Sequence, residues 1–147
     1  MPVQHIIIRQ SFNAPAETIF TLLTDHETFG RLVNAKIKRV KDSLGSNKNG
    51  LGSVRRIKAF LAPAFEETVV TFIPDQLMEY RVSKGSPIKN HKGCMAFFDE
   101  QGKTRIEYTI DFEPKLPFPF WGIILRKAIE KPIRNGLKRL AGRYDTK

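Results

Sequence analysis

The sequence predicts a two-layer α+β fold, in which a curved antiparallel sheet of seven strands lies against one long C-terminal helix. Three observations indicate this class. One β-type segment opens the chain, six more follow between residues 35 and 112, and helical spacing of apolar residues takes over after residue 120. Two short helices are expected between the first strand and the second. The length of 147 residues suits one ordinary domain, and we expect residues 1–147 to form it.

The first strand and both short helices are predicted from the N-terminal third of the chain. Residues 3–12 are rich in β-branched side chains, which favours a strand. Pro15 then suits the first turn of a helix, and Glu17 lies near the positive end of its dipole. Asp25 can cap a second short helix over residues 26–33. The two helices should therefore form a helical hairpin.

Six short segments between residues 35 and 112 are separated by Gly, Asn, Pro and Asp, which predicts successive antiparallel strands. Alternation is clearest in the last segment, whose apolar residues are Ile106, Tyr108, Ile110 and Phe112. One face of the sheet should therefore be buried and the other solvated.

The C-terminal segment predicts one long amphipathic helix, because apolar residues recur every three or four positions opposite a basic side. The uncharged stretch LPFPFWGIIL, residues 116–125, opens it. A membrane-spanning helix requires about 18 apolar residues, so this stretch should not cross a bilayer. We expect it to form a wall and hinge of an internal cavity, with attachment to a membrane surface as the alternative.

Charge is concentrated at the C-terminal end. The formal net charge is +10, and residues 119–147 hold eight Lys or Arg against two acidic residues. This balance favours weak attraction to acidic surfaces. The basic side of the helix lacks interleaved aromatic residues, so we expect no specific nucleic-acid binding. Cys94 is the only cysteine, and residues 1–10 lack the features of a secretory signal, so the cytoplasm is the expected compartment.

Several motifs resemble one known superfamily in their order and spacing. They are FNAPAETIFTLLTD (12–25), GLGSVRRI (50–57), PDQLMEYRV (74–82), GKTRIEYTIDF (102–112) and the terminal helix. The chain resembles the START-like helix-grip superfamily, also called SRPBCC or Bet v I-like, and within it the polyketide cyclase/dehydrase-like branch. The resemblance implies a sheet that grips the C-terminal helix around a ligand cavity. By similarity to plant abscisic-acid receptors of this topology, residues 60–65 and 85–91 are expected to form two loops over its mouth.

Seven residues are candidates for binding a ligand in that cavity: Glu66, Tyr80, His91, Tyr108, Trp121, Leu125 and Ile129. Strand alternation allows only one of Glu66 and Glu67 to face inward, and the resemblance favours Glu66, with Thr68, Val70 and Phe72 on the same side. A buried carboxylate would have a raised pKa and could act as an acid or base.

The other polar candidates carry hydrogen-bonding groups on apolar faces. His91 should share its face with Gly93, Met95 and Phe97, where a neutral imidazole can bond a ligand carbonyl or move a proton. Tyr80 and Tyr108 present hydroxyls suited to orienting a ligand or to core packing. One of Arg55 and Arg56 should also reach inward, and the sequence does not indicate which.

The motifs exclude several chemistries and leave two functions open. The three histidines lack the spacing of metal ligands, and no phosphate loop or dinucleotide fingerprint occurs, so we expect neither metal nor cofactor. One function is binding of a small, largely hydrophobic molecule such as a lipid, polyketide or aromatic metabolite. The other is an enzyme of the cyclase/dehydratase type, in which Glu66, His91 or a tyrosine moves protons.

Overall fold

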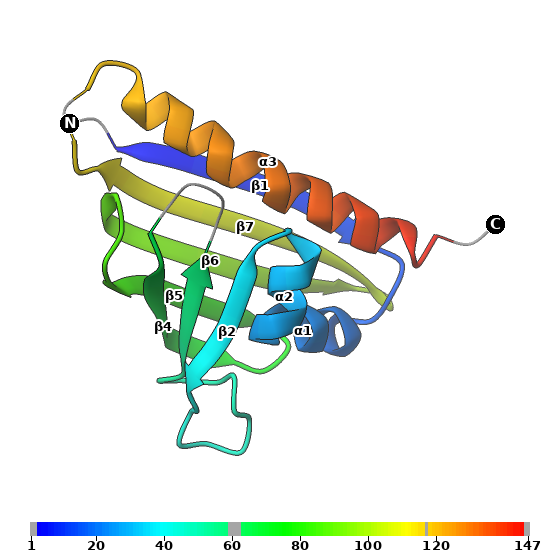
Figure 1. Cartoon of the computed structure of the whole chain (residues 1–147). Coiled ribbons are helices and arrows are strands. Elements are labelled where there is room, and N and C mark those ends of the chain that lie inside the picture. The colour runs from blue at the N-terminus through cyan, green and yellow to red at the C-terminus, as the bar shows by residue number, and fades with distance from the viewer. Residues whose placement is uncertain (1–2, 59–62, 117, 146–147) are drawn as a thin grey trace.

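All strands of the molecule join one antiparallel sheet in the order β1-β7-β6-β5-β4-β3-β2 (Figure 1). The structure, a computed structural model, describes residues 3–58, 63–116 and 118–145. The strands are β1 (Gln4–Phe12), β2 (Lys36–Lys41), β3 (Val54–Lys58), β4 (Phe65–Ile73), β5 (Leu77–Lys84), β6 (Ile88–Glu100) and β7 (Lys103–Pro114). The helices are α1 (Ala16–Thr24), α2 (His26–Leu32) and α3 (Trp121–Gly142). The predicted α+β class, with seven strands and two short helices between β1 and β2, is confirmed.

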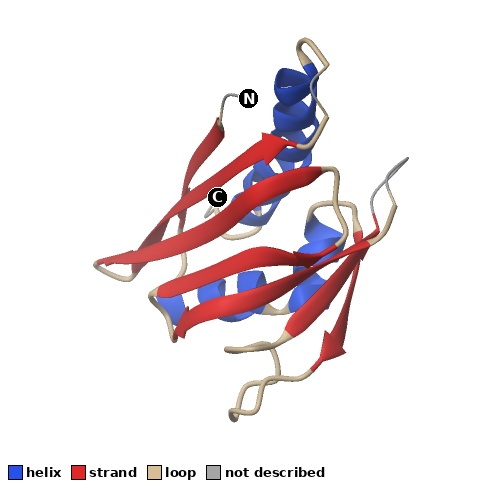
Figure 2. Ribbon diagram, turned by 90° about the vertical axis from the view of Figure 1, so that its left-hand side faces the viewer, coloured by secondary structure: helices blue, strands red, loops and turns tan. Residues whose placement is uncertain are grey.

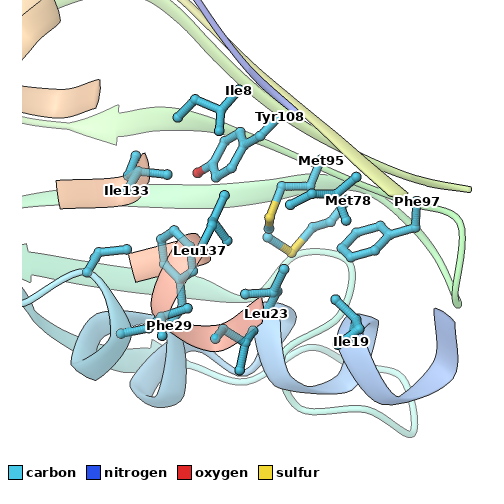
Figure 3. Packing of buried hydrophobic residues seen from close by; sticks show 14 of the residues in the cluster. Ile8, Ile19, Leu23, Phe29, Met78, Met95, Phe97, Tyr108, Ile133 and Leu137 are labelled. Carbon is cyan, nitrogen blue, oxygen red and sulfur yellow. The ribbon is translucent and has the colours of Figure 1, made fainter. Parts of the chain in front are cut away.

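The core lies between the sheet and the three helices, which share one side of it (Figure 2). The alternation predicted for β7 is confirmed, since its four inward residues from Ile106 to Phe112 are at most 2% exposed. Figure 3 shows Met78, Met95 and Phe97 of the sheet directed toward α1. This packing fixes which side chain of each strand reaches the interior.

A helix contacts each edge strand of the sheet. α3 runs along β1 (Figure 1), and Arg134 Nη2 donates to the Ile7 carbonyl at 3.4 Å. At the opposite edge, the Glu27 carboxylate of α2 accepts from the Arg39 backbone N–H of β2 at 2.6 Å. These contacts occupy strand groups that would otherwise be open to pairing with another chain.

Three residues determine how the helices begin, approach one another and continue: Asp25, Gly136 and Pro132. Asp25 caps α2 as predicted, since its carboxylate accepts from the Thr28 N–H at 3.0 Å. α3 approaches α2 closely at Gly136, where a Cβ atom would lie only 2.6 Å from the Leu32 carbonyl oxygen. α3 continues through Pro132, which removes the N–H that would have bonded the carbonyl four residues earlier.

Most of the stretch 116–125 does not form the cavity wall that the sequence predicted. Five of its apolar side chains are exposed: Leu116, Phe118, Phe120, Ile123 and Ile124. Successive helical residues are about 100° apart, so Ile123 and Ile124 point away from the side that carries buried Gly122 and half-buried Leu125. Leu116, Phe118 and Phe120 precede α3 and so lie outside the helical side that packs on the sheet.

Candidate ligand-binding site

Five neighbouring strands each send one polar or phenolic side chain into the interior. The residues are Arg55 of β3, Glu67 of β4, Tyr80 of β5, His91 of β6 and Tyr108 of β7. All five are buried, although three of them carry a charged group or an imidazole. Burial of such groups is costly unless they are paired, so their contacts define what the cluster can do. We call these five residues the polar cluster.

Arg55 and Glu67 form the centre of the polar cluster. They are direct partners across β3 and β4, and Glu67 Oε1 accepts from Arg55 Nε at 2.9 Å and lies 2.8 Å from Nη2. Burial disfavours the charge on Arg55, but the Glu67 carboxylate together with Tyr80 and Tyr108 outweighs this effect, so the pKa of Arg55 is raised. The guanidinium therefore remains a fixed cation inside the protein, balanced by one carboxylate.

The guanidinium of Arg55 lies between two aromatic rings and keeps one nitrogen unused. Its carbon is 4.3 Å from the centre of the Tyr80 ring and 5.3 Å from that of Phe29 on α2. These distances allow cation–π attraction. Its Nη1 atom is buried without a hydrogen-bond partner among the described residues. A buried donor without an acceptor is unfavourable, so Nη1 is suited to bond an oxygen supplied from outside the chain.

His91 is held in one tautomer beside this ion pair. Its Nδ1 accepts from the Val82 backbone N–H at 3.1 Å, so the ring proton of the neutral form resides on Nε2, 3.6 Å from Glu67 Oε2. Burial lowers the pKa of His91; Glu67 opposes this shift and Arg55 adds to it. His91 is therefore neutral at neutral pH. It faces inward with Gly93, Met95 and Phe97, as predicted.

Tyr80 and Tyr108 meet through their hydroxyl groups. The Tyr80 ring crosses β6 at Gly93, where any side chain would collide with it. Figure 3 shows Tyr108 directed from the sheet toward the helices. Burial raises the pKa of Tyr108 to about 12, although Arg55 opposes the shift, and burial raises the pKa of Tyr80 well above its usual value. Both hydroxyls therefore stay protonated; one donates to the other, so a single O–H of the pair remains to donate to another group.

The predicted orientation of Glu66 is wrong, because Glu67 is the inward residue of the pair. Glu66 is only partly buried and has cross-strand neighbours Arg56 and Lys84. The resemblance favoured Glu66 on the same side as Phe72, and Phe72 does pack on the core. However, the pairing of β4 with β5 shifts register between Val69 and Thr71, which reverses the alternation before that point.

The same bulge explains the other reversed positions of β4. Val69 is buried and Val70 is exposed, so the predicted inward Val70 is also wrong, as is Thr68. The structure also settles the arginine pair, since Arg55 is inward and 1% exposed whereas Arg56 is exposed.

The three candidates on α3 lie on its inner side. Leu125 and Ile129 are partly buried and pack against the core, and Trp121 is partly buried at the first helical position. The role of these three residues in ligand binding stays a prediction. The first expected mouth loop, residues 60–65, falls partly on residues 59–62, which lie outside the described residues. In the other, β6 begins at Ile88 and leaves only residues 85–87 as a turn.

His26 is a buried group that sequence reasoning did not select. Its Nε2 lies 2.9 Å from Ser53 Oγ, and its Nδ1 has no partner among the described residues. Burial, and then the positive charges of Arg55 and Arg39, lower the pKa of His26 to about 3. His26 is thus a neutral residue at the start of α2. Its position at a helix start, next to acidic residues, gave no signal of burial.

A pocket of about 380 Å³ lies outside the polar cluster and is lined by residues of α2, β2 and β3. Its lining includes Arg31, Lys36, Lys38 and Arg56. The cavity expected between the sheet and α3 therefore stays a prediction. The described ranges contain no group of three possible metal ligands. Within them, too, no helix combines the length and hydropathy that a membrane span requires.

Solved structures of similar shape cover nearly the whole chain. The START superfamily protein from Mycobacterium smegmatis has a TM-score of 0.76 at 17% identity, over 95% of this chain and 96% of its own. The ZhuI aromatase/cyclase from Streptomyces sp. R1128 has a TM-score of 0.75 at 14% identity, over 97% and 95%. Norcoclaurine synthase from Thalictrum flavum has a TM-score of 0.69 at 10% identity, over 99% and 90%. At these identities the likeness shows the fold.

Sequence comparison identifies the family. None of the curated proteins compared shows significant sequence similarity to the chain. The family model described as "Polyketide cyclase / dehydrase and lipid transport", however, matches residues 5–145. With the helix-grip fold and these structural relatives, the chain belongs to this polyketide cyclase/dehydrase family of the SRPBCC, or START and Bet v 1-like, superfamily.

Proposed function

We propose that the protein binds a small, largely apolar molecule that carries an uncharged oxygen acceptor, with the acceptor at Arg55 Nη1. The proposal depends mainly on this buried nitrogen, which has no hydrogen-bond partner among the described residues. Because Glu67 already balances the charge of Arg55, a ketone or ester oxygen fits better than a second carboxylate. Apolar core residues would surround the rest of the molecule, and Trp121, Leu125 and Ile129 are its proposed contacts on α3.

The protonated tyrosines and His91 would complete the recognition of the oxygen. Tyr80 and Tyr108 keep their protons at neutral pH and meet at one point. The guanidinium lies over the Tyr80 ring, so the hydroxyls and Nη1 belong to one cluster. Buried sites that hydrogen-bond a ligand oxygen discriminate strongly against analogues that lack it. We therefore expect selectivity to come from the oxygen and affinity from apolar contacts.

Two measurements test this proposal. Native mass spectrometry of the purified protein should detect a copurified small molecule. NMR titration should then show that 2-acetylnaphthalene, a ketone, binds at least about tenfold more tightly than 2-ethylnaphthalene, because a hydrogen bond to a charged group contributes about 1.5–3 kcal/mol. 2-Naphthoate should not exceed the ketone.

The matched variants separate recognition from folding. Arg55→Met with Glu67→Met removes both charges of the pair together and should leave a folded protein that no longer prefers the ketone. Arg56→Met, on the exposed face, is the control and should keep the preference. If no probe binds saturably, or if ketone and hydrocarbon bind equally, the proposal is wrong.

A cyclase/dehydratase-type enzyme is the second candidate, on the observation that His91 Nε2 faces the Glu67 carboxylate beside two phenols. Such groups could move a proton on a bound carbonyl compound. Time-dependent conversion of a copurified molecule by the wild type, but not by His91→Gln, would support the enzyme. A ligand whose mass and NMR spectrum both stay unchanged over time would support the carrier, because cyclisation alone conserves the mass and only dehydration lowers it.

The proposal also includes two broader expectations about the protein's surroundings. We propose the cytoplasm as its compartment, because its one cysteine requires no oxidising environment; cell fractionation tests this. We also propose that nucleic-acid binding is weak and unselective. A gel shift that showed tight, sequence-selective binding at physiological salt would contradict this.

A further inference from the structure

We propose that the start of α3 docks on the surface of an anionic lipid membrane. The docking element is the α3 apolar patch, defined as Leu116, Phe118, Phe120, Ile123 and Ile124. Phe118 and Phe120 are 60% and 75% exposed, and all five residues lie within nine positions of the chain. Clustered exposed apolar residues mark surfaces for a partner or a membrane, whereas single ones need no explanation.

The backbone presents this patch outward. Phe120 precedes the first turn with φ 63°, a left-handed conformation that is unfavourable for a side chain of this size. The Ile124 N–H bonds the Phe120 carbonyl at 3.0 Å, which joins the two residues in one turn. Gly122, on the other side, packs against Gln4 of β1. The inner side of α3 is thus committed to the sheet while the patch faces solvent.

Lysines follow the patch along the same side of α3. Lys127, Lys131 and Lys138 are exposed and continue the helical side on which Phe120 and Ile124 lie, by the spacing of 3.6 residues per turn. Among the described residues none of the three lysines forms an ion pair, whereas nearby Glu130 is held by Arg134 at 2.7 Å. The first turn of α3 contains no acidic residue.

This arrangement fits an acidic lipid surface better than other occupants. Aromatic and aliphatic side chains enter the boundary between headgroups and acyl chains, while lysines beside them reach the phosphates. A second copy of the chain is disfavoured by repulsion, since each copy carries a net charge of +10. Bases could stack on the phenylalanines, but the three aliphatic residues of the patch give nothing for stacking.

Vesicle sedimentation tests the proposal, and none of the substitutions used below falls in the polar cluster or at a proposed ligand contact of α3. The purified chain is sedimented with vesicles of phosphatidylcholine alone or mixed equally with phosphatidylglycerol, and the emission of Trp121, beside the patch, is recorded. We expect binding and a blue shift with the anionic vesicles, weak binding to the neutral ones, and loss of binding at high salt.

Variants assign the effect to the patch and the lysines. Phe118→Ser with Phe120→Ser should lower the partition coefficient at least about tenfold. Lys127→Gln with Lys131→Gln should lower it by about tenfold and weaken its salt dependence. Leu44→Ser, at a fully exposed hairpin position, is the control and should bind like the wild type. Thermal unfolding checks that each variant is folded. If the Phe118→Ser, Phe120→Ser variant is unfolded, the Lys127→Gln, Lys131→Gln variant still tests the proposal.

Several results would overturn the proposal. They are equal binding by wild type and phenylalanine variant, equal binding to neutral and anionic vesicles, competition by duplex DNA for the same residues, or sedimentation of a stable dimer that buries the patch.

Discussion

Arg55 and Glu67 face each other across β3 and β4 and form an ion pair that solvent does not reach. Buried pairs of this kind contribute little net stability compared with well-packed apolar residues. They become costly when one partner is removed, because the other charge is then buried alone. The pair therefore gives the molecule an internal cation in a fixed position, and this property is the one that a ligand can use.

Glu67→Gln should destabilise the protein by about 3 kcal/mol, because it leaves Arg55 without its counter-ion. Glu66→Gln should change the free energy of unfolding by less than about 0.5 kcal/mol, since its side chain is only partly buried at the surface. Urea unfolding at neutral pH measures both values. Equal effects of the two substitutions would contradict the register shift in β4, because the two carboxylates would then have similar surroundings.

Stability should depend on pH through His26. The unfolded chain binds a proton at His26 near pH 6.5, whereas the folded protein does so only at about pH 3. The free energy of unfolding should therefore fall by up to about 1.4 kcal/mol per pH unit from this group as pH decreases across that window. His26→Gln should reduce the slope in this window. A His26→Gln slope equal to that of the wild type would contradict the burial of this imidazole.

Gly93→Ala should cost about 1 to 3 kcal/mol, because the new methyl group collides with the Tyr80 ring. Tyr80→Leu in the same chain should recover part of this loss, since it removes the ring. A double-mutant cycle by thermal unfolding gives the coupling between the two positions. Additive effects would mean that the ring does not cross β6 at Gly93.

The two sides of α3 should differ sharply in their tolerance of truncation. Leu137→Ala should destabilise the protein by about 2 to 5 kcal/mol, because the side chain is fully buried. Ile124→Ala removes a half-exposed side chain and should cost less than about 0.5 kcal/mol. Chemical denaturation of both variants checks this, and a large loss at Ile124 would place it in the core.

Regular alternation made most of the fold predictable from sequence. The inward residues of β7, and those of β6 from His91 to Phe97, follow a period of two, and both predictions are confirmed. Prediction fails where the period breaks. The register shift of β4 reverses Glu66 and Glu67, and nothing in the local sequence marks it, because Val69 and Val70 have the same propensity.

The site itself was less predictable than the fold. Tyr80, Tyr108 and His91 were selected because they lie on apolar faces, but their meeting with Arg55 depends on the register in which successive strands pair. The exposure of Phe120 depends on a left-handed backbone conformation that composition does not favour for phenylalanine. Both features arise from tertiary structure.

The polar cluster draws one residue from each of five adjacent strands, so it exists only when β3 to β7 are all in register. These strands follow one another in the chain, and all four pairings between them must form before the five side chains can meet. A partly folded chain therefore has no binding site, and a ligand can stabilise only the complete sheet. Amide hydrogen exchange should slow across all five strands together when the site is filled, as one cooperative unit.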